Sequence, residues 1–507
     1  MPAAELKAQL RDTRQRSWTN KHETYTQPLR TLFDLANPST GKLLDRYNAT
    51  TRELQALIGR AVKAGARVRA LGGGWSLSRA PATDGWLVNT KLLNLTFQVD
   101  KRMVVGGYTG DREGLRFVQC GCSIQELNKR LRSQGRSLRT SGASNGQTIV
   151  GALSTGTHGS AFGIGSVQDA VVGLHLIVGA NRHVWLERAS APVMSDTFAA
   201  RLGAEPLRDD ALFNAALVSF GSFGVIHGVM LETDELFLLE MHRRRMPLDG
   251  ALRKCLNSLD FSGLTLPGGA VTPYHFQVVV NPFDLDAGVH VTTLYKRPFQ
   301  NDYVRAAANA EGFGPGDDAP SFIGLVSDAL PVSIPSVVNG VLGRAYGPLD
   351  KVQGTLGEIF SNNTLRGKVA SAAVGVPVSR SAEVLDTLLD LNRREGPFPI
   401  LAALRFVKAT RATLGWARFE PTCVFELDGP LSSRNLELYQ RMWRALRQRG
   451  IPHTFHWGKM LELDAARVRG QYGDAVGQWM AARETLLDAK TRRVFSSPFL
   501  EELGLAS

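Results

Sequence analysis

The chain has 507 residues, of which 43% are hydrophobic and 21% are charged, so it can bury a large core and is not disordered. Only four cysteines are present, which excludes a scaffold held together by disulfides. The formal net charge is +12, from 59 Lys and Arg against 47 Asp and Glu. This excess leaves nucleic acid, an acidic membrane surface and an anionic small molecule open as partners.

The sequence contains no signal for export or membrane insertion. Its start lacks the apolar core of a signal peptide, and no stretch of 18 apolar residues occurs. We therefore expect a cytoplasmic protein without a transmembrane segment. The basic residues are dispersed and their densest run is Arg243–Arg245, which disfavours nucleic-acid binding. Cys120 and Cys122 form C-x-C and not C-x-x-C, so we expect no metal site.

Helices and strands alternate from about residue 45 to residue 230. Thr50 and Glu53 have the spacing of a capping box and predict a helix start, and Gly65 predicts its end. A short strand over 68–71 follows, and it leads into a run of glycines.

The same order of elements returns further along the chain. A strand is predicted over 117–121, and Ser123 and Glu126 form a second capping box. Gly135 marks the predicted end of that helix.

The region from about 239 to 455 has a different pattern. Alternating apolar residues predict antiparallel strands over 274–281 and 289–294. Residues 309–318 are rich in Gly, Asp and Asn and read as a loop, and 472–487 has the pattern of an amphipathic helix.

Three glycine-rich segments carry the chemistry. The first runs Gly72-Gly73-Gly74-Trp75-Ser76 after a strand, where backbone N–H groups can approach a phosphate closely. It matches neither G-x-G-x-x-G nor a Walker A loop, so alone it fits a structural turn as well. The second spans 141–160, with a density of Gly, Ser and Thr that suits a backbone wrapped around a large polar ligand. The third spans 219–226, where glycines alternate with apolar residues.

Further motifs join these loops. Trp18-Thr-Asn20 lies near the start, His456-Trp-Gly-Lys459 near the end, and residues 493–504 close the chain. Together they resemble the vanillyl-alcohol-oxidase superfamily of FAD enzymes, and most closely its aldonolactone and alditol oxidases. The resemblance implies an α+β fold: a two-subdomain FAD-binding domain over 15–238, and a substrate or cap domain with a large antiparallel sheet over 239–454. A C-terminal segment, 455–507, would close over the flavin.

The resemblance also implies how FAD is held. Many relatives carry a His in the first loop that bonds covalently to the flavin, and Trp75 stands there, which implies non-covalent FAD. His158 lines the cofactor in this comparison and does not bond to it. The residues expected at FAD are Gly72, Gly73, Gly74, Trp75, Ser76, Ser141, Gly142, Ser144, Asn145, Ser154, Gly156, Thr157, His158, Gly159, Ser160, Gly224, Val225, Ile226 and Lys459.

Gly142 aligns by spacing with the position that controls oxygen access in the family. A glycine leaves room for O2 beside the flavin, which favours an oxidase over a dehydrogenase. Gly142 can also serve the turn alone.

The substrate side departs from the family pattern. Relatives carry E-x-R on a central strand, and here Ala403-Leu404-Arg405 keeps the Arg and loses the Glu. Arg405 and Lys459 would supply positive charge at the substrate oxygen and the reduced flavin. Glu426 on the next predicted strand either replaces the lost carboxylate or faces solvent.

Two residues are candidates for taking the substrate proton, His456 and Glu426. Tyr274 and His275 are further candidates for the substrate pocket, with Ala403. The function implied is hydride transfer from the CH–OH group of a small molecule to FAD, and then to O2 with release of H2O2.

A dehydrogenase using a quinone or cytochrome, and a silent FAD-binding protein, remain alternatives. The substrate is expected to be hydrophobic or sugar-like. As a lid over the site, the apolar segment 321–342 would suit a hydrophobic alcohol, and a membrane contact or core are its other interpretations.

Overall fold

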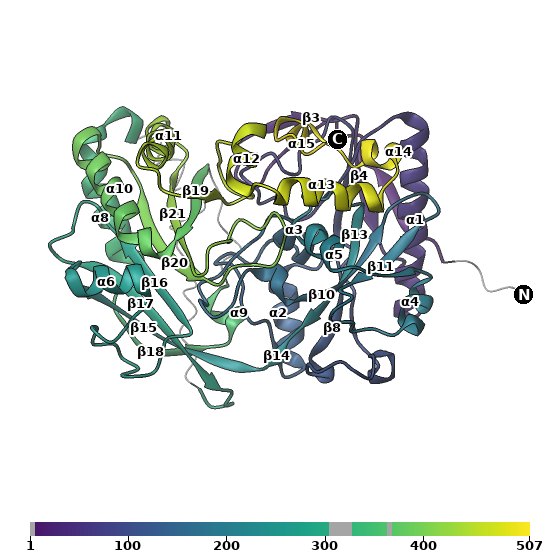
Figure 1. Cartoon of the computed structure of the whole chain (residues 1–507), viewed down its shortest axis with the longest axis horizontal. Coiled ribbons are helices and arrows are strands. Elements are labelled where there is room, and N and C mark those ends of the chain that lie inside the picture. Colours follow the sequence, from purple (N-terminus) through teal and green to yellow (C-terminus); the bar gives the residue numbers. More distant parts are fainter. Residues whose placement is uncertain (1–5, 304–326, 362–367, 507) are drawn as a thin grey trace, which may run out of the picture.

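The computed structural model describes residues 6–303, 327–361 and 368–506. These residues form two bodies that lie side by side (Figure 1). One contains the first half of the chain and the C-terminal helices, and the other contains the region between them. The mixture of helices and sheets confirms the predicted α+β class. The loop predicted at 309–318 lies outside the described residues.

A four-stranded sheet opens the first body, with the order β1-β4-β6-β5. Its strands are β1 (Gln9–Asp12), β4 (Thr31–Ala36), β5 (Val68–Leu71) and β6 (Trp86–Leu92). Helix α1 (Leu43–Ala64) connects β4 to β5, and Gly65 ends it in the left-handed conformation, as predicted. The predicted start at Thr50 is wrong. Thr50 lies inside the helix, where its hydroxyl donates to Asn37 Oδ1 and to Arg46 O and caps nothing.

A six-stranded sheet follows, in the order β12-β11-β10-β13-β8-β7. Its strands are β7 (Thr96–Gln98), β8 (Leu115–Gln119), β10 (Val171–Ile177), β11 (His183–Glu187), β12 (Glu205–Arg208) and β13 (Val225–Glu232). Helix α2 (Ile124–Ser133) begins with the predicted capping box, in which Glu126 N donates to Ser123 Oγ at 3.1 Å. Two small sheets in one body agree with a two-subdomain architecture.

The second body is built on an eight-stranded antiparallel sheet in the order β18-β15-β17-β16-β20-β21-β19-β22. The strands are β15 (Phe237–Met246), β16 (His275–Val280), β17 (Val289–Pro298), β18 (Leu349–Gly354), β19 (Val369–Pro377), β20 (Leu401–Val407), β21 (Thr422–Pro430) and β22 (Thr454–Phe455). The strands predicted around 274–281 and 289–294 are β16 and β17, which pair directly.

Side chains alternate between the two faces of this sheet. On β20, Ala402, Leu404 and Phe406 are buried in the hydrophobic core. The intervening residues Ala403 and Arg405 point to the other face, where a cavity lies. Helices α6 (Gly250–Ser258), α10 (Ser381–Glu395) and α11 (Ser433–Gln448) complete the core of this body.

The C-terminal segment returns to the first body. Its helices are α12 (Ala465–Tyr472), α13 (Ala475–Leu486), α14 (Ala489–Val494) and α15 (Pro498–Glu502). They lie beside α1 and α5 (Asp210–Leu217), in yellow in Figure 1. Trp479 Nε1 donates to Val218 O at 3.1 Å, and Arg483 Nε to Ser222 O at 3.0 Å. The helix predicted over 472–487 is α13, and Gly473, at φ 55°, separates it from α12.

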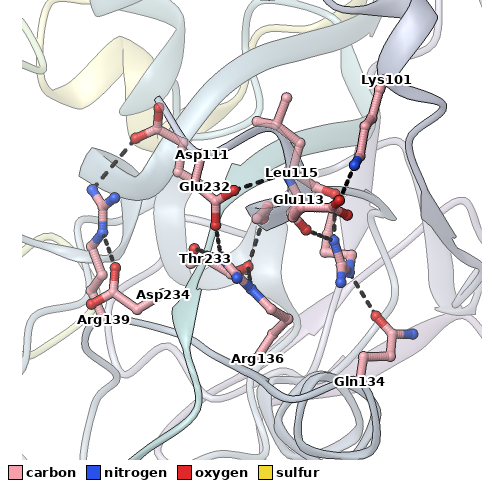
Figure 2. A network of polar contacts seen from close by, with 12 residues as sticks. Lys101, Asp111, Glu113, Leu115, Gln134, Arg136, Arg139, Glu232, Thr233 and Asp234 are labelled. Carbon is pink, nitrogen blue, oxygen red and sulfur yellow. Dashed lines mark hydrogen bonds and ion pairs between the residues drawn. The ribbon is translucent and has the colours of Figure 1, made fainter. Parts of the chain in front are cut away.

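A polar network fixes the place where the chain passes from one body to the other, at β14 (Asp234–Glu235) (Figure 2). Asp234 accepts from Arg139 Nε at 2.8 Å and from Lys296 Nζ, on the second body, at 2.7 Å. Arg136, drawn below Thr233 in Figure 2, donates to Asp111 Oδ2 at 2.6 Å and to Thr233 O at 2.5 Å. Among these bonds, the one from Lys296 to Asp234 joins the two bodies at their junction.

All four cysteines are free and buried. Within the described ranges, no group of His, Cys, Asp and Glu has the arrangement of a metal site. Of the helices formed by those same residues, none is long and apolar enough to cross a membrane.

Candidate active site

A cavity of about 480 Å³ lies where the glycine loops of the first body meet the sheet of the second. Ligand sites of small molecules have volumes in this range. All three glycine-rich segments, the strands β16, β20 and β21, and the segment after β22 contribute to its wall.

Most predicted site residues share this cavity. Its wall includes Gly72, Gly73, Gly74, Trp75, Ser76, Gly142, Ser144, Ser154, Thr157, His158, Gly224, Val225, Ile226, Ala403, Arg405, Glu426, His456 and Lys459. The predicted residues behind the wall are Ser141, Asn145, Gly156, Gly159, Ser160, Tyr274 and His275.

The first loop follows β5 and is held against the second loop. A Cβ atom at Gly73 would lie 2.6 Å from Gly146 O, so only glycine permits this approach. The N-terminal motif secures the loop from the other side, since Asn20 Nδ2 donates to Ser76 O at 3.0 Å and Lys21 N to Gly74 O at 2.9 Å. This explains physically why the two motifs occur together.

Trp75 lines the cavity at the end of the first glycine loop. Its ring meets the edge of His22 at 5.4 Å between centroids, and Lys21 Nζ lies 5.1 Å from its ring centre. Burial, and then the charge of Lys21, lower the pKa of His22 to about 4, so this ring is neutral at pH 7.

The residues of the wall fit a flavin dinucleotide. The glycine loops bring backbone to the cavity wall, where N–H groups can bind a phosphate. Gln147 Oε1 and Arg405 Nε are buried in the wall without a hydrogen-bond partner among the described residues. Polar atoms left in this state in a protein interior indicate a polar ligand.

Arg69 is a further cationic residue of the wall, which sequence reasoning missed. Its guanidinium is buried and donates to the carbonyls of Ala80, at 2.7 Å, and Phe220. In the described chain it has no carboxylate partner. Burial, and then the charge of Arg483, lower its pKa to about 9. The sequence feature that could have identified Arg69 is its position in the otherwise apolar strand β5, directly before the glycines of the first loop.

A charged cluster occupies the sheet side of the cavity. Glu426 Oε2 lies 3.1 Å from Arg405 Nη1, and Glu426 Oε1 accepts from Lys459 Nζ at 2.5 Å. Burial alone would raise the pKa of the Glu426 carboxyl, but Arg405 and Lys459 hold it well below its ordinary value. The pKa of Lys459 is raised because Asp428 and Glu426 outweigh the effect of burial. The cluster therefore sets two cations, Arg405 and Lys459, against the carboxylates of Glu426 and Asp428, and Asp428 Oδ1 lies 3.6 Å from Lys459 Nζ.

Glu426 is 2% exposed, so the alternative that it faces solvent is wrong. It stands opposite Ala403 in the antiparallel pair of β20 and β21. A carboxylate is therefore present beside Arg405, but it comes from the neighbouring strand.

His456 is oriented by its own loop. Its Nδ1 accepts the N–H of Gly458 at 2.9 Å, so the proton of the neutral ring is on Nε2. Burial, and then His158 and Lys459, lower the pKa of His456 well below its ordinary value. At neutral pH this ring donates through Nε2, and its one lone pair is already occupied.

Tyr274 and His275 do not reach the cavity. Tyr274 OH donates to Arg139 O at 2.7 Å, and His275 stacks on Phe360 at 5.2 Å. Gln277, which faces Arg405 across β16 and β20, lines the wall instead. The two-residue period of the strand relates Gln277 to Val279, which also lines the wall, and this periodicity could have identified both.

Helix α8 (Ile334–Ala345) supplies an apolar wall. Val337, Val338 and Val341 face the cavity next to Val279 and Tyr346. The predicted segment 321–342 therefore contributes a helix to the site, and its part 321–326 lies outside the described residues.

Known proteins are similar to this chain in sequence and in fold. Residues 46–187 match the family "FAD binding domain". L-Gulono-1,4-lactone dehydrogenase of Mycobacterium tuberculosis is 25% identical over 453 residues, which are 87% of this chain and 93% of that protein. D-Arabinono-1,4-lactone oxidase of Debaryomyces hansenii is 29% identical over 210 residues, 40% of this chain and 34% of that protein. The crystal structure of cholesterol oxidase from B. sterolicum has the same fold, with a TM-score of 0.71 at 14% identity, covering 98% of this chain and 97% of that one.

Proposed function

We propose that the chain oxidises an alcohol group of a small molecule and passes the electrons to O2. The premise is that it belongs to the vanillyl-alcohol-oxidase superfamily of FAD-dependent oxidoreductases. FAD is held by the glycine loops without a covalent bond, because an indole at Trp75 cannot form the histidyl link. Bound FAD supplies the hydride acceptor and the store for two electrons.

The charged cluster activates the substrate. An alcohol has a pKa near 16, so removal of its hydrogen requires a field that stabilises the alkoxide. Arg405 and Lys459 supply this field from one side of the cavity. Glu426, which Arg405 and Lys459 hold ionised, accepts the hydrogen bond of the substrate hydroxyl and orients it. The hydroxyl proton is released to solvent as the hydride leaves. His456 donates through Nε2 and does not act as the base, because Gly458 already occupies its lone pair.

One observation carries the proposal: a buried carboxylate is clamped between Arg405 and Lys459, in the cavity lined by the flavin loops. Ionic groups are costly to bury, and structures retain them where they act. A catalytically silent FAD-binding protein would not need this cluster.

The wall favours an alcohol with an apolar body. Val337, Val338 and Val341 of α8 and Val279 of β16 form an apolar side of the cavity. A sugar lactone, the substrate type named for the two relatives above, is the second candidate. The Glu426 carboxylate beside Arg405 favours it, since it can hold a sugar hydroxyl.

The test is an anaerobic screen of the FAD-loaded protein with primary and secondary alcohols, sterols, aldoses and aldonolactones. We expect one class to bleach the flavin, and air to restore the yellow colour with one H2O2 per turnover. A protein that bleaches but is reoxidised only by a quinone would be a dehydrogenase. A protein that takes up no FAD would overturn the proposal.

A further inference from the structure

Arg69 stands apart from the other charged residues of the cavity wall. The others that the structure describes all lie on the sheet side: Arg405, Lys459, Glu426 and Asp428. Two cations meet two carboxylates there, so the formal charges of that cluster cancel. Arg69 lies on β5 instead, on the side of the glycine loops, and its guanidinium meets no carboxylate of the described chain.

A second buried arginine adds to the positive charge around Arg69. Arg483 of α13 is 0% exposed, and its guanidinium donates to backbone carbonyls, among them Ser222 O at 3.0 Å and Arg492 O at 2.7 Å. It forms no ion pair with any described residue. Burial, and then the charge of Arg483, lower the pKa of Arg69 to about 9, so the two cations are close enough to repel each other. Buried charges are normally paired, and these two therefore indicate an anion that the described residues do not supply.

Both arginines hold the third glycine loop in place. Arg69 donates to Phe220 O, and Arg483 donates to Ser222 O two residues later. Phe220 has a φ of 52°, in the left-handed region that a bulky side chain rarely adopts, and Gly221 follows at 71°. Phe220 and Gly221 both line the cavity, and a Cβ atom at Gly221 would lie 3.7 Å from Arg69 Nη1. Strained backbone of this kind concentrates where a ligand is clamped.

The two glycine loops that meet Arg69 suit a phosphate group. Arg69 donates to Ala80 O at 2.7 Å, shortly after the first loop, and to Phe220 O in the third, so its guanidinium lies between the two loops. Backbone N–H groups of such loops bind phosphate oxygens, and a guanidinium binds them with paired N–H donors. FAD, the cofactor that the wall fits, carries an anionic diphosphate, which would balance the charge of these arginines.

We propose that Arg69 binds the diphosphate of FAD and so places that part of the cofactor between the first and third glycine loops. The inference rests on the proposed function only for the identity of the cofactor. The sheet-side cluster, whose formal charges cancel, is then left for the uncharged ring system of the oxidised flavin and for the substrate.

The test is isothermal titration calorimetry of the full-length protein, freed of FAD, with two fragments of the cofactor. ADP carries the diphosphate without the flavin, and riboflavin carries the flavin without the diphosphate. We expect Arg69→Met to weaken ADP binding by about 30-fold or more and to change riboflavin binding by less than about twofold, because the lost charge-assisted hydrogen bonds act only on phosphate. Arg69→Lys keeps the charge but not the paired donors, so it should weaken ADP binding by about tenfold and spare riboflavin.

Several results would overturn the proposal. Equal weakening of both fragments would mean that Arg69 only holds the loops, and unchanged ADP binding would mean that it does not meet the phosphates. A wild-type protein that takes up FAD but binds no ADP would contradict it as well. If Arg69→Met does not fold, Arg69→Lys decides by the same comparison of the two fragments.

A matched control and a second readout complete the experiment. Arg30→Met, at an exposed position outside the wall, should bind both fragments as the wild type does. Inorganic pyrophosphate should raise the melting temperature of the wild type and of Arg30→Met, but not that of Arg69→Met. An equal response in all three proteins would contradict the proposal. These measurements use no substrate, so a protein that binds ADP through Arg69 but oxidises no alcohol would contradict the proposed function alone.

Discussion

Ala403 and Glu426 are direct partners across the antiparallel strands β20 and β21. Directly opposed residues have Cβ atoms about 5 Å apart, so a carboxylate can move from one strand to the other and still reach the same space. The sequence showed a missing Glu at Ala403, and the structure places Glu426 beside the same arginine, 3.1 Å away. The negative charge of Glu426 and its contacts with Arg405 and Lys459 lead to the first two predictions.

Glu426→Gln should abolish the ion pairs and reduce the rate of flavin reduction by about 100-fold or more, because the removed charge orients both cations. Stopped-flow measurement of flavin bleaching checks this. Glu437→Gln, on the exposed face of α11, is the matched control and should retain the full rate. Equal rates in the two variants would remove Glu426 from the mechanism.

Moving the carboxylate from β21 to β20 should restore part of the lost rate of flavin reduction. Glu426→Ala should be slow, and adding Ala403→Glu should recover about tenfold in rate, since the new side chain lies beside Arg405. Adding Ala373→Glu instead places the carboxylate on β19, the other neighbour of β21, and should recover nothing. Thermal unfolding confirms that each double variant is folded. Equal recovery from both positions would mean that the location of the carboxylate is unimportant.

Gly142→Ala should slow the reaction of the reduced flavin with O2 by about tenfold and leave flavin reduction intact. The added Cβ would lie 3.0 Å from Thr157 Cγ2, so the methyl is wedged into the cavity wall. Thr157→Ser removes that Cγ2 and serves as a background in which the steric pressure is relieved. If air reoxidises the variant at the wild-type rate in both backgrounds, Gly142 serves the turn alone.

Acid precipitation should leave the yellow colour in the supernatant, because Trp75 provides no nucleophile for the flavin methyl group. Absorbance at the flavin band before and after centrifugation measures the distribution. Yellow in the pellet would show a covalent link and contradict the role assigned to Trp75.

His275 should make stability fall as the pH is lowered. Burial, and then Arg405, lower its pKa to about 3, against about 6.5 in an unfolded chain. Between these values the unfolded state binds the extra proton, so this group costs about 1.4 kcal/mol of unfolding free energy for each pH unit below 6.5. His275→Phe keeps the stacking on Phe360 and should lose that slope. Denaturant unfolding at pH 8, 6.5 and 5 tests this, with pH 8 as the internal control and an unchanged slope as the contrary result.

The sequence motifs predicted the glycine loops more reliably than they predicted which residues line the sheet side of the cavity. Gly72 to Ser76 and the capping box at Ser123 depend on local chemistry, which a single sequence displays. Thr50 resembled a helix cap, but its hydroxyl serves Asn37, 13 residues away in the chain. Tyr274 alternates with the residues of β16 that line the wall, Gln277 and Val279, and which face meets the cavity depends on pairing with β20. His275 shares their face but lies at the first residue of β16, outside the wall. The third contact of Glu426, from His158, joins residues 268 positions apart and has no local signal.

The return of the last helices to the first body has a consequence for synthesis. Leu77 N donates to Gly458 O at 2.9 Å and Ser78 Oγ to Trp457 O at 2.5 Å, so the flavin loop is completed by residues made long after it. A ribosome adds about 5 to 20 residues per second, so the first body waits roughly 10 to 50 s for this partner while the second is made. During this interval the apolar surface that Trp479 covers is exposed. Chaperone supply during translation, more than the stability of the finished protein, should therefore limit the yield of the expressed enzyme.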